Sequence, residues 1–297
     1  QIAAAGNHGI LMMGPPGSGK TMLASCLPSI LPPLEEDERL EAALVHSVAG
    51  EDTTAILNGR RPFRCPHHSA SSAGLIGGGS PVRPGEISLA HAGVLMLDEL
   101  PEFKPSVLQQ LRQPIETGKV SITRADGNIT FPARFMLVAA ANPCPCGFFG
   151  DPEKPCTCTV PQISSYQNRI GGPLMDRIDI HVDIRRIPAE EVIASKVGST
   201  SEELAQGVLA AREYASWRES IGDGRATTRE VIASCRLSRA DEKFFERIAA
   251  MNSMSGRGIV RTLSVARTIA DMAQRKAVCK DDLCEAIGFR VREGARP

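Results

Sequence analysis

The stretch ILMMGPPGSGKT, residues 10–21, decides the fold of this chain of 297 residues. Its first four residues are apolar and predict a buried strand. The next eight, GPPGSGKT, match the pattern G-x-x-x-x-G-K-[ST] at every required position, and residues 22–27 can begin a helix. In such a turn the glycines let successive backbone N–H groups point at one phosphate, and the helix N-terminus adds partial positive charge. The stretch therefore predicts a phosphate-binding loop for a nucleoside triphosphate.

Two side chains at the end of this loop have specific roles in such a site. Lys20 can reach the β- and γ-phosphates, and Thr21 can offer its hydroxyl to Mg²⁺. The alternative is an ordinary glycine-rich turn, and the strand and helix on either side argue against it. The residues predicted to bind nucleotide are Gly14, Pro15, Pro16, Gly17, Ser18, Gly19, Lys20, Thr21 and Met22.

Composition narrows the class of protein. The chain has 34 basic and 34 acidic residues, so its formal net charge is zero and any nucleic-acid site has to be local. No stretch approaches the roughly 20 apolar residues of a membrane helix, and residues 1–5 carry no basic leader. Most of the nine cysteines are scattered singly, which together with a nucleotide site indicates a reducing, cytoplasmic location. Residues 1–5 look like the last turn of a helix, so we expect that an upstream part of the protein is missing.

Two further apolar runs end in polar side chains of the kind that act on phosphates. Residues 93–99 read GVLMLDE, which predicts a buried parallel strand ending in Asp98 and Glu99. Asp98 can hold Mg²⁺ through water, and Glu99 can polarise the attacking water. Residues 134–141 predict another buried strand, which ends at Asn142, where open α/β sheets place ligands. A lone Asn in this position would otherwise be an ordinary turn residue.

The segments between these strands predict the rest of the core. Leu40, Leu44 and Val48 recur at helical spacing after an acidic start, which predicts a helix over residues 35–48. Residues 70–85 are rich in Gly, Ser and Pro and indicate either a flexible surface loop or a loop that contacts a substrate. The other expected elements are a strand over 62–65, an amphipathic helix over 103–117, a hairpin over 119–132 that turns at 125–128, a helix over 163–170 and a strand over 180–184.

A cysteine-rich loop follows Asn142. Two C-x-C pairs separated by nine residues place four thiols in it, Cys144, Cys146, Cys156 and Cys158. Four cysteines in a loop rich in Gly and Pro can bind Zn²⁺ as a tetrathiolate, and an oxidisable thiol pair and inert thiols are the alternatives. Residues 65–68, Cys-Pro-His-His, also look like a ligand cluster, but nothing nearby in the sequence completes it, so a structural role is favoured.

From Pro188 onward, apolar residues at helical spacing predict only helices, which cover residues 201–217, 241–251, 258–273 and 280–291. Arg257 and Arg261 lie four positions apart, on a face away from the apolar residues, where a solvated surface is the alternative to a functional role. The predicted fold class is α/β. A three-layer P-loop domain with a parallel sheet, residues 1–187, is followed by an all-helical lid domain, residues 188–297.

Taken together, these stretches resemble an AAA+ ATPase of the magnesium-chelatase-like branch that includes the ComM/YifB proteins. The resemblance covers nearly the whole chain, and its middle motifs are specific to ComM/YifB. The motifs are GPPGSGKT (14–21), RPFRCPHHS (61–69), RPGEISLAHAGVLMLDELPEF (83–103), LRQPIETGKVSITRADG (111–127), NPCPCGFFGDP (142–152), GPLMDRIDIHV (172–182) and VARTIADM (265–272).

The resemblance implies a role for each candidate in the nucleotide site. Lys20 and Thr21 correspond to the Walker A residues, and Asp98 and Glu99 to the Walker B residues. Asn142 is similar to the sensor-1 residue that orients the attacking water.

The resemblance also implies that the active site is shared between subunits of a homo-hexameric ring. Arg177, in the motif LMDRID, is similar to an arginine finger that acts in trans on the nucleotide of a neighbouring subunit. Arg257 matches the lid (sensor-2) arginine, with Arg261 as the runner-up.

Two segments resemble elements that line the pore of such rings. Residues 119–132 are similar to a presensor-1 hairpin, and residues 76–86 to a helix-2 insert. Arg83, Lys119 and Arg124 would then be cations that grip DNA phosphates, and solvated surface charges are the alternative.

The implied function is Mg²⁺-dependent ATP hydrolysis by a hexameric helicase that promotes DNA branch migration during natural transformation. One alternative is the motor subunit of a metal chelatase, against which the NPCPCG segment argues. The other is a MoxR-like ATPase that remodels proteins. ComM/YifB proteins carry an N-terminal domain and an entry helix before the Walker A strand, and this chain has neither. We therefore expect hexamer formation or DNA binding to be impaired in it.

Overall fold

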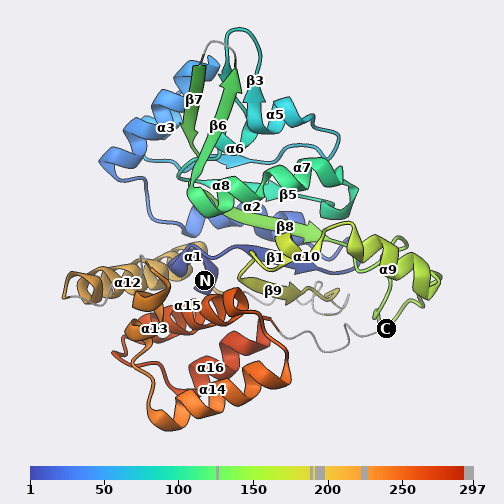
Figure 1. The fold of residues 1–297 in the computed structure, drawn as a ribbon, viewed down its shortest axis with the longest axis vertical. Helices are drawn as coiled ribbons and strands as arrows, with labels where there is room; N and C mark the ends of the chain where they lie inside the picture. The colour runs from blue at the N-terminus through green and yellow to red at the C-terminus, as the bar shows by residue number, and fades with distance from the viewer. Residues whose placement is uncertain (125–126, 188–189, 191–197, 222–226, 291–297) are drawn as a thin grey trace.

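The computed structural model describes residues 1–124, 127–187, 190, 198–221 and 227–290. Within these residues, a parallel sheet flanked by helices lies at the centre, and helices from the C-terminal third lie below it in Figure 1. This is the predicted α/β domain followed by a helical region, so the prediction of the fold class is confirmed.

Five parallel strands form the central sheet, in the spatial order β2 (Phe63–Arg64), β5 (Val94–Leu97), β8 (Met136–Ala141), β1 (Ile10–Met13) and β9 (Ile180–Asp183). Strand β1 lies inside the sheet, with Ile10 opposite Val138 on one side and Ile180 on the other. Each parallel neighbour is reached by a crossover connection, which is why helices separate the strands along the chain. A strand was expected at each of the five places, and three of the five were predicted from apolar runs.

The two faces of the sheet belong to two apolar clusters, because successive side chains of a strand point to opposite faces. Met12 and Met96 belong to the first cluster, which continues into the C-terminal helices through residues such as Leu263. Leu11 and Leu95 belong to the second. The first cluster includes residues of α1 (Ile2–Gly6) and α2 (Lys20–Ile30). The second includes residues of α5 (Ser72–Ile76), α6 (Glu86–Leu89) and α10 (Gly172–Met175).

Helix α3 (Glu36–Ala49) confirms the helix expected over residues 35–48. The three residues whose spacing predicted this helix nevertheless face solvent: Leu40, Leu44 and Val48 are 56%, 66% and 48% exposed. The side that packs against the core consists instead of Ala42, Val45 and His46. Helix α4 (Thr54–Leu57) follows it.

The prediction of a single helix over residues 103–117 is wrong. The chain forms a short 3₁₀ turn, η1 (Leu100–Glu102), and then two helices, α7 (Pro105–Gln110) and α8 (Arg112–Thr117), which meet at Leu111. The break has a local cause, because Pro114 has no N–H to donate to the carbonyl of Gln110 and its ring would clash with that carbonyl.

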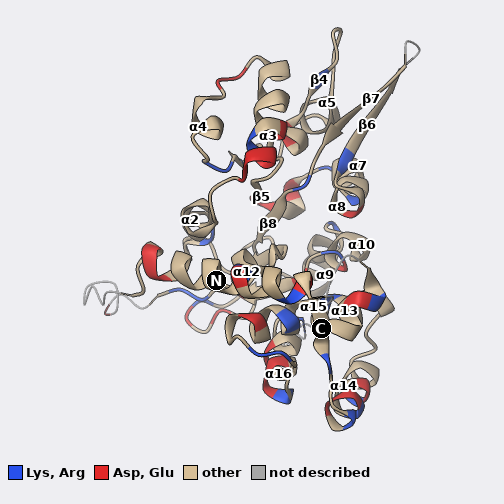
Figure 2. Cartoon of the chain, turned by 90° about the vertical axis from the view of Figure 1, so that its left-hand side faces the viewer, with Lys and Arg blue, Asp and Glu red and all other residues tan. Residues whose placement is uncertain are grey.

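Two small antiparallel hairpins project side by side from the core, at the top of Figure 1 and Figure 2. One pairs β3 (Gly77–Gly78) with β4 (Arg83–Pro84), within the segment expected to be a loop. The other pairs β6 (Lys119–Arg124) with β7 (Gly127–Pro132) and confirms the predicted hairpin. Its strands pair as far as Arg124 and Gly127, so the turn is shorter than expected. Its two connecting residues, 125–126, lie outside the described residues.

The C-terminal helices are α12 (Ser201–Ser220), α13 (Thr228–Cys235), α14 (Arg239–Met251), α15 (Gly256–Met272) and α16 (Lys280–Gly288). The four predicted helices are present, and α13 is an addition. Ser238 caps α14 by accepting a hydrogen bond from the N–H of Asp241 at 3.1 Å. Residue 291, the expected end of the last helix, lies outside the described residues.

Acidic and basic residues are interspersed along the C-terminal helices in Figure 2, in keeping with the zero net charge. Within the described ranges, none of the helices combines the length and the apolar character that crossing a lipid bilayer requires.

Candidate active site

The carboxyl ends of three neighbouring strands carry the residues predicted to act on phosphate. Strand β1 leads into residues 14–19, β5 into Asp98 and β8 into Asn142. Because the strands are parallel and adjacent, these ends meet at one edge of the sheet. We refer to it as the carboxyl edge, and to the opposite one as the amino edge.

Lys20 opens helix α2 and is only 9% exposed. Its Nζ donates to the carbonyl oxygens of Gly14 at 2.8 Å and Pro15 at 2.9 Å, and to Oδ1 of Asn142 at 3.2 Å. Burial lowers the pKa of the ammonium, and the Asp98 carboxylate opposes that shift. The structure thus places the predicted lysine in direct contact with the predicted asparagine.

Thr21 and Asp98 form a second contact at this edge. The Thr21 hydroxyl donates to Oδ2 of Asp98 at 2.6 Å, and Oδ1 of Asp98 accepts the backbone N–H of Glu99 at 2.8 Å. A hydroxyl and a carboxylate are hard oxygen ligands of the kind that Mg²⁺ prefers. The pair therefore fits the predicted magnesium site.

The loop before Lys20 leaves room for a phosphate. Gly17 and Gly19 have φ angles of 77° and 83°, which glycine adopts without strain. A Cβ atom on Gly17 would meet nothing within 4 Å, whereas one on Gly14 would lie 2.2 Å from the carbonyl oxygen of Ile184. The loop is therefore tightly packed where it leaves the sheet and open farther along. Of the other predicted contacts, Ser18 is buried, and Pro16 and Met22 are exposed.

Glu99 has a partner that the sequence did not indicate. Its Oε2 lies 3.1 Å from Nδ1 of His68, whose ring packs edge-on against Phe103 with the ring centroids 6.4 Å apart. The sequence favoured a structural role for this histidine. No local pattern could have linked it to Glu99, because the contact joins segments that are distant along the chain.

Arg177 lies at the amino edge, away from the phosphate-binding loop of its own chain. It precedes β9, which starts opposite the first residue of β1. Its guanidinium donates to Oε1 of Glu116 at 2.6 Å and to the carbonyl oxygen of Pro173 at 2.6 Å. Arg257 donates to the same oxygen of Glu116 at 2.9 Å. The two predicted arginines therefore share one carboxylate, which the sequence did not single out.

Arg261 has a different partner from Arg257. It donates to the buried carboxylate of Asp179, which also accepts the N–H of Gly9 at 3.1 Å and lies 3.4 Å from Nδ1 of His8. Burial alone would raise the pKa of Asp179, but His8 and Arg261 hold it at about 2. Arg261 thus ties helix α15 to the start of strand β9.

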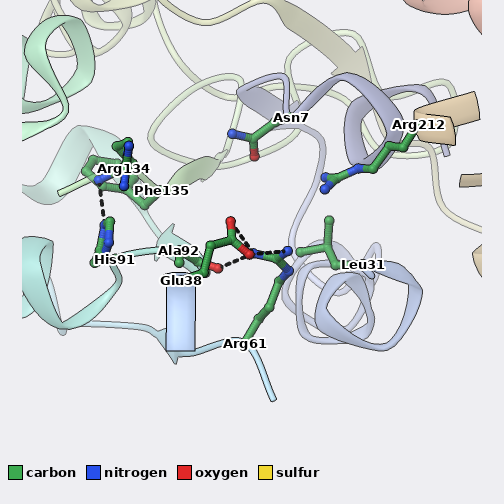
Figure 3. Close-up of a pocket in the computed structure, with 10 residues that line it drawn as sticks. Asn7, Leu31, Glu38, Arg61, His91, Ala92, Arg134, Phe135 and Arg212 are labelled. Carbon is green, nitrogen blue, oxygen red and sulfur yellow. Dashed lines mark hydrogen bonds and ion pairs between the residues drawn. The ribbon is translucent and has the colours of Figure 1, made fainter. Parts of the chain in front are cut away.

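A cavity of about 300 Å³ also lies at the amino edge (Figure 3). Arg61 lines it and pairs with Glu38 at 2.9 Å, and Nδ1 of His91 accepts the backbone N–H of Arg134 at 3.1 Å. Arg212 reaches into the cavity from α12 (Figure 3). These polar groups are engaged with other parts of the chain, so the cavity is a junction between the sheet and the C-terminal helices.

The sulfur atoms of the four predicted metal ligands, Cys144, Cys146, Cys156 and Cys158, all lie within 4.8 Å of one another. Cys144 is buried, with its Sγ 3.4 Å from that of Cys146 and 3.6 Å from that of Cys156. Four sulfur atoms placed tetrahedrally at the usual zinc distance are about 3.8 Å apart. The spacing therefore fits a metal tetrathiolate.

The charges of these thiols also favour a cation. The backbone N–H groups of Phe148 and Thr157 lower the pKa of Cys146 to about 5. The N–H of Cys158 acts in the same direction on Cys156, but burial and the neighbouring sulfur atoms of Cys146 and Cys144 raise the pKa of Cys156 to about 12. Without a metal the cluster holds one thiolate easily and a second poorly, whereas a divalent cation stabilises several.

The predicted DNA-contacting cations lie on the two hairpins, in different places. Arg83 is exposed on β4. Lys119 is at the base of the other hairpin, where it pairs with Pro132, and Arg124 is at its far end. Five positions of extended chain separate these two by about 17 Å. The side chain of Arg124 lies outside the described part of the chain, so only its place in β6 is reported.

A phosphate-binding loop after an inner strand of a parallel sheet, acidic residues after a strand two places away in the same sheet and a set of C-terminal helices are the features of the AAA+ class. The family model for magnesium chelatase, subunit ChlI, matches residues 1–192, and the model for the ChlI C-terminal region matches residues 198–290. The chain belongs to this magnesium chelatase ChlI family, in its ComM/YifB branch.

Three relatives show the extent of the similarity. The chain is 43% identical over 295 residues to the uncharacterised protein YifB of Salmonella typhimurium, and 42% identical over 291 residues to the competence protein ComM of Haemophilus influenzae. Both alignments cover 98% of this chain and 57% of the relative, so the chain spans less than two thirds of their length. It is 19% identical over 315 residues to the magnesium-chelatase subunit ChlI of Euglena gracilis, covering 97% of this chain and 83% of that protein.

Proposed function

We propose that this chain is the ATP-hydrolysing part of an AAA+ motor that moves DNA. The contact between Lys20 and Asn142 carries the proposal, with the Thr21–Asp98 contact beside it. An amine, an amide, a hydroxyl and a carboxylate converge where three parallel strands end. This is the set of groups that binds and activates a terminal phosphate.

The proposed reaction is the in-line attack of water on the γ-phosphate of ATP, without a covalent intermediate. Lys20 binds the β- and γ-phosphates, Glu99 polarises the water and Asn142 orients it. Mg²⁺, held by Thr21 and through water by Asp98, would neutralise charge on the phosphate oxygens.

We further propose that a neighbouring copy completes each site in a homo-hexameric ring. Arg177 and the phosphate-binding loop lie at opposite edges of the sheet, so a head-to-tail arrangement can bring the Arg177 of one subunit to the loop of the next. Arg257 lies beside it, is 47% exposed and is assigned the same interface as the lid arginine. Arg261 is less exposed, at 24%, and pairs with the buried carboxylate of Asp179. It therefore ranks behind Arg257 as the candidate for the lid arginine.

The proposed substrate is DNA, and the proposed work is helicase-driven branch migration during natural transformation, in the cytoplasm. The similarity to the competence protein ComM supports this proposal, as do the two projecting hairpins. Arg83, Lys119 and Arg124 are the proposed contacts with DNA phosphates.

We propose that the four-cysteine cluster holds one structural Zn²⁺. Closed tetrathiolate sites suit this ion, which serves there as a folding cross-link. Elemental analysis should find about one zinc per chain. A folded, metal-free preparation with four titratable thiols in this loop would contradict the assignment.

We also propose that the chain is divided into an ATPase core, residues 1–187, and a lid, residues 188–297. Residues 188–189 and 191–197 lie outside the described residues, so the boundary itself is not placed.

The decisive experiment is to measure ATP turnover by the full-length protein with and without forked DNA. The motor proposal expects stimulation by DNA, and Glu99→Gln should abolish turnover while keeping nucleotide binding. Turnover that responds to a porphyrin instead would favour the chelatase alternative, which the chelatase family models keep open. Turnover indifferent to both would favour a MoxR-like ATPase that acts on proteins.

A further inference from the structure

The four-cysteine loop begins beside the proposed nucleotide site. Asn142, which accepts the hydrogen bond from Lys20, is separated from Cys144 only by Pro143. The carbonyl oxygen of Pro143 in turn accepts a hydrogen bond from Gln167 at 3.0 Å. The cysteine loop is therefore joined through one residue to the side chain that contacts Lys20.

The same loop is also seated against the phosphate-binding loop. A Cβ atom on Gly147 would lie 2.5 Å from Cδ and 2.8 Å from Cγ of Pro16, so only glycine fits against this ring. Gly147 follows Cys146 directly and has a φ of 84°, in the left-handed region that favours glycine. The turn is closed by its N–H, which donates to the carbonyl oxygen of Cys144 at 2.9 Å.

Arg186 ties the two loops together from the end of β9. Its Nη2 donates to the carbonyl oxygen of Pro16 at 3.5 Å, and its guanidinium carbon lies 5.2 Å from the centroid of the Phe148 ring. Its Nε lies 3.9 Å from Oδ2 of Asp151. One side chain thus contacts the phosphate-binding loop and two residues of the cysteine loop.

We infer that the metal-loaded cysteine loop supports the phosphate-binding loop, so that loss of the metal weakens nucleotide binding. The inference rests on the proposed ATP site and the proposed metal site. Closing Cys144, Cys146, Cys156 and Cys158 around one ion fixes the turn that carries Gly147, and this turn holds Pro16 from one side while Asn142 holds Lys20 from the other.

The first test changes the contact between Gly147 and Pro16 while leaving the metal ligands in place. Gly147→Ala in the full-length protein leaves all four cysteines in place and drives a methyl group into the Pro16 ring. We expect zinc content to stay at the wild-type level, and the Kd for a fluorescent ATP analogue to rise about tenfold, as when one charge-assisted hydrogen bond to phosphate is lost.

Gly150→Ala is the matched control. Gly150 lies in the same loop with a φ of 79°, so alanine meets the same backbone strain there, but its Cβ would meet nothing within 4 Å. The Kd of Gly150→Ala should stay within about twofold of the wild type, because this variant has the backbone strain of Gly147→Ala but not its clash with Pro16. Equal Kd values for the two variants would overturn the inference.

The second test removes the metal. The full-length protein is stripped with a chelator, freed of it by gel filtration and returned to Mg²⁺, and the Kd for the analogue is then measured before and after Zn²⁺ is added back. Weaker binding that zinc restores is expected. Cys158→Ser should mimic the stripped protein, whereas Cys284→Ser, at an exposed position on α16, should bind like the wild type.

Unchanged nucleotide affinity in stripped, folded protein would overturn the inference and leave the ATP site intact. A wild-type protein that binds no nucleotide, with or without zinc, would instead overturn the proposed ATPase itself. Lys20→Ala gives the baseline for lost binding in both cases.

Discussion

Arg177 and Glu116 form an ion pair in which Nη2 of the guanidinium lies 2.6 Å from Oε1 of the carboxylate. The Arg177 side chain is 10% exposed, and its Nε is buried without a hydrogen-bond partner among the described residues. Arg257 binds the same carboxylate oxygen. The pair therefore keeps two cations together at the amino edge, with one guanidinium nitrogen still able to donate.

Arg177→Ala should leave ATP binding unchanged and reduce turnover in the full-length protein by about 10³-fold or more, the usual contribution of a finger in trans. Binding of a fluorescent nucleotide and steady-state phosphate release measure the two effects separately. Arg247→Ala, at an exposed position on α14, is the control for loss of an arginine as such. Normal turnover in Arg177→Ala would refute the assignment.

Asn142→Ala should reduce the turnover number by roughly 10²- to 10³-fold, as expected when one preorganised polar group is removed from the reacting centre. Nucleotide affinity should change much less, because Lys20 keeps the carbonyl partners that hold it in place. Single-turnover rates with saturating ATP report the effect on the chemical step. A large rise in Kd with an unchanged single-turnover rate would show that Asn142 acts in binding alone.

His68→Ala should release Glu99 from its partner and raise DNA-independent ATP turnover. A partly exposed contact of this kind is worth at most about 1 kcal/mol, so the increase should not exceed about fivefold. A fall in turnover in His68→Ala would mean that the imidazole assists the carboxylate.

Acidification should destabilise the protein through His91. Burial lowers the pKa of His91 below its ordinary value, and the hydrogen bond to Glu41 only partly opposes this. The unfolded chain therefore binds the proton more readily, and stability falls as the pH drops below about 6.5. Protonation would also end the hydrogen bond that Nδ1 accepts from the N–H of Arg134.

The change His91→Gln tests this pH dependence. It should cost about 1 kcal/mol of stability at pH 7.5, the usual cost of one lost hydrogen bond. The difference from the wild type should shrink at pH 5.5, because the variant has no imidazole to protonate. Urea unfolding at both values measures the two differences, and an equal gap would contradict the assignment.

Much of the parallel sheet and the loop after its strand β1 could be predicted because their signals are local. The run 10–21 contains both the strand and the loop that follows it, and Asp98 and Asn142 mark the ends of apolar strands. The break between α7 and α8 was missed, although Pro114 stands in the expected helix. Helix α5 was likewise missed within the segment expected to be a loop, although Ser71 caps it by accepting the N–H of Gly74 at 3.0 Å.

The remainder depended on contacts between distant segments. Leu40 and Leu44 have the spacing of a buried face, yet the core meets the other side of α3, and periodicity alone does not say which side packs. Glu116 and His68 owe their places in the site to residues far along the chain, Arg177 and Glu99. No sequence pattern marks such a pair before the fold brings it together.

The apolar cluster shared by Met12 of the sheet and Leu263 of helix α15 limits how the molecule can move. Swinging the C-terminal helices away from the sheet would expose this surface at about 25 cal/mol per Å², whereas sliding them along it keeps the side chains in contact. Any stroke driven by hydrolysis should therefore be a lateral shear of the lid. Its reach would be set by the spacing of side-chain ridges, and opening the helices as a hinge would cost the burial of this cluster.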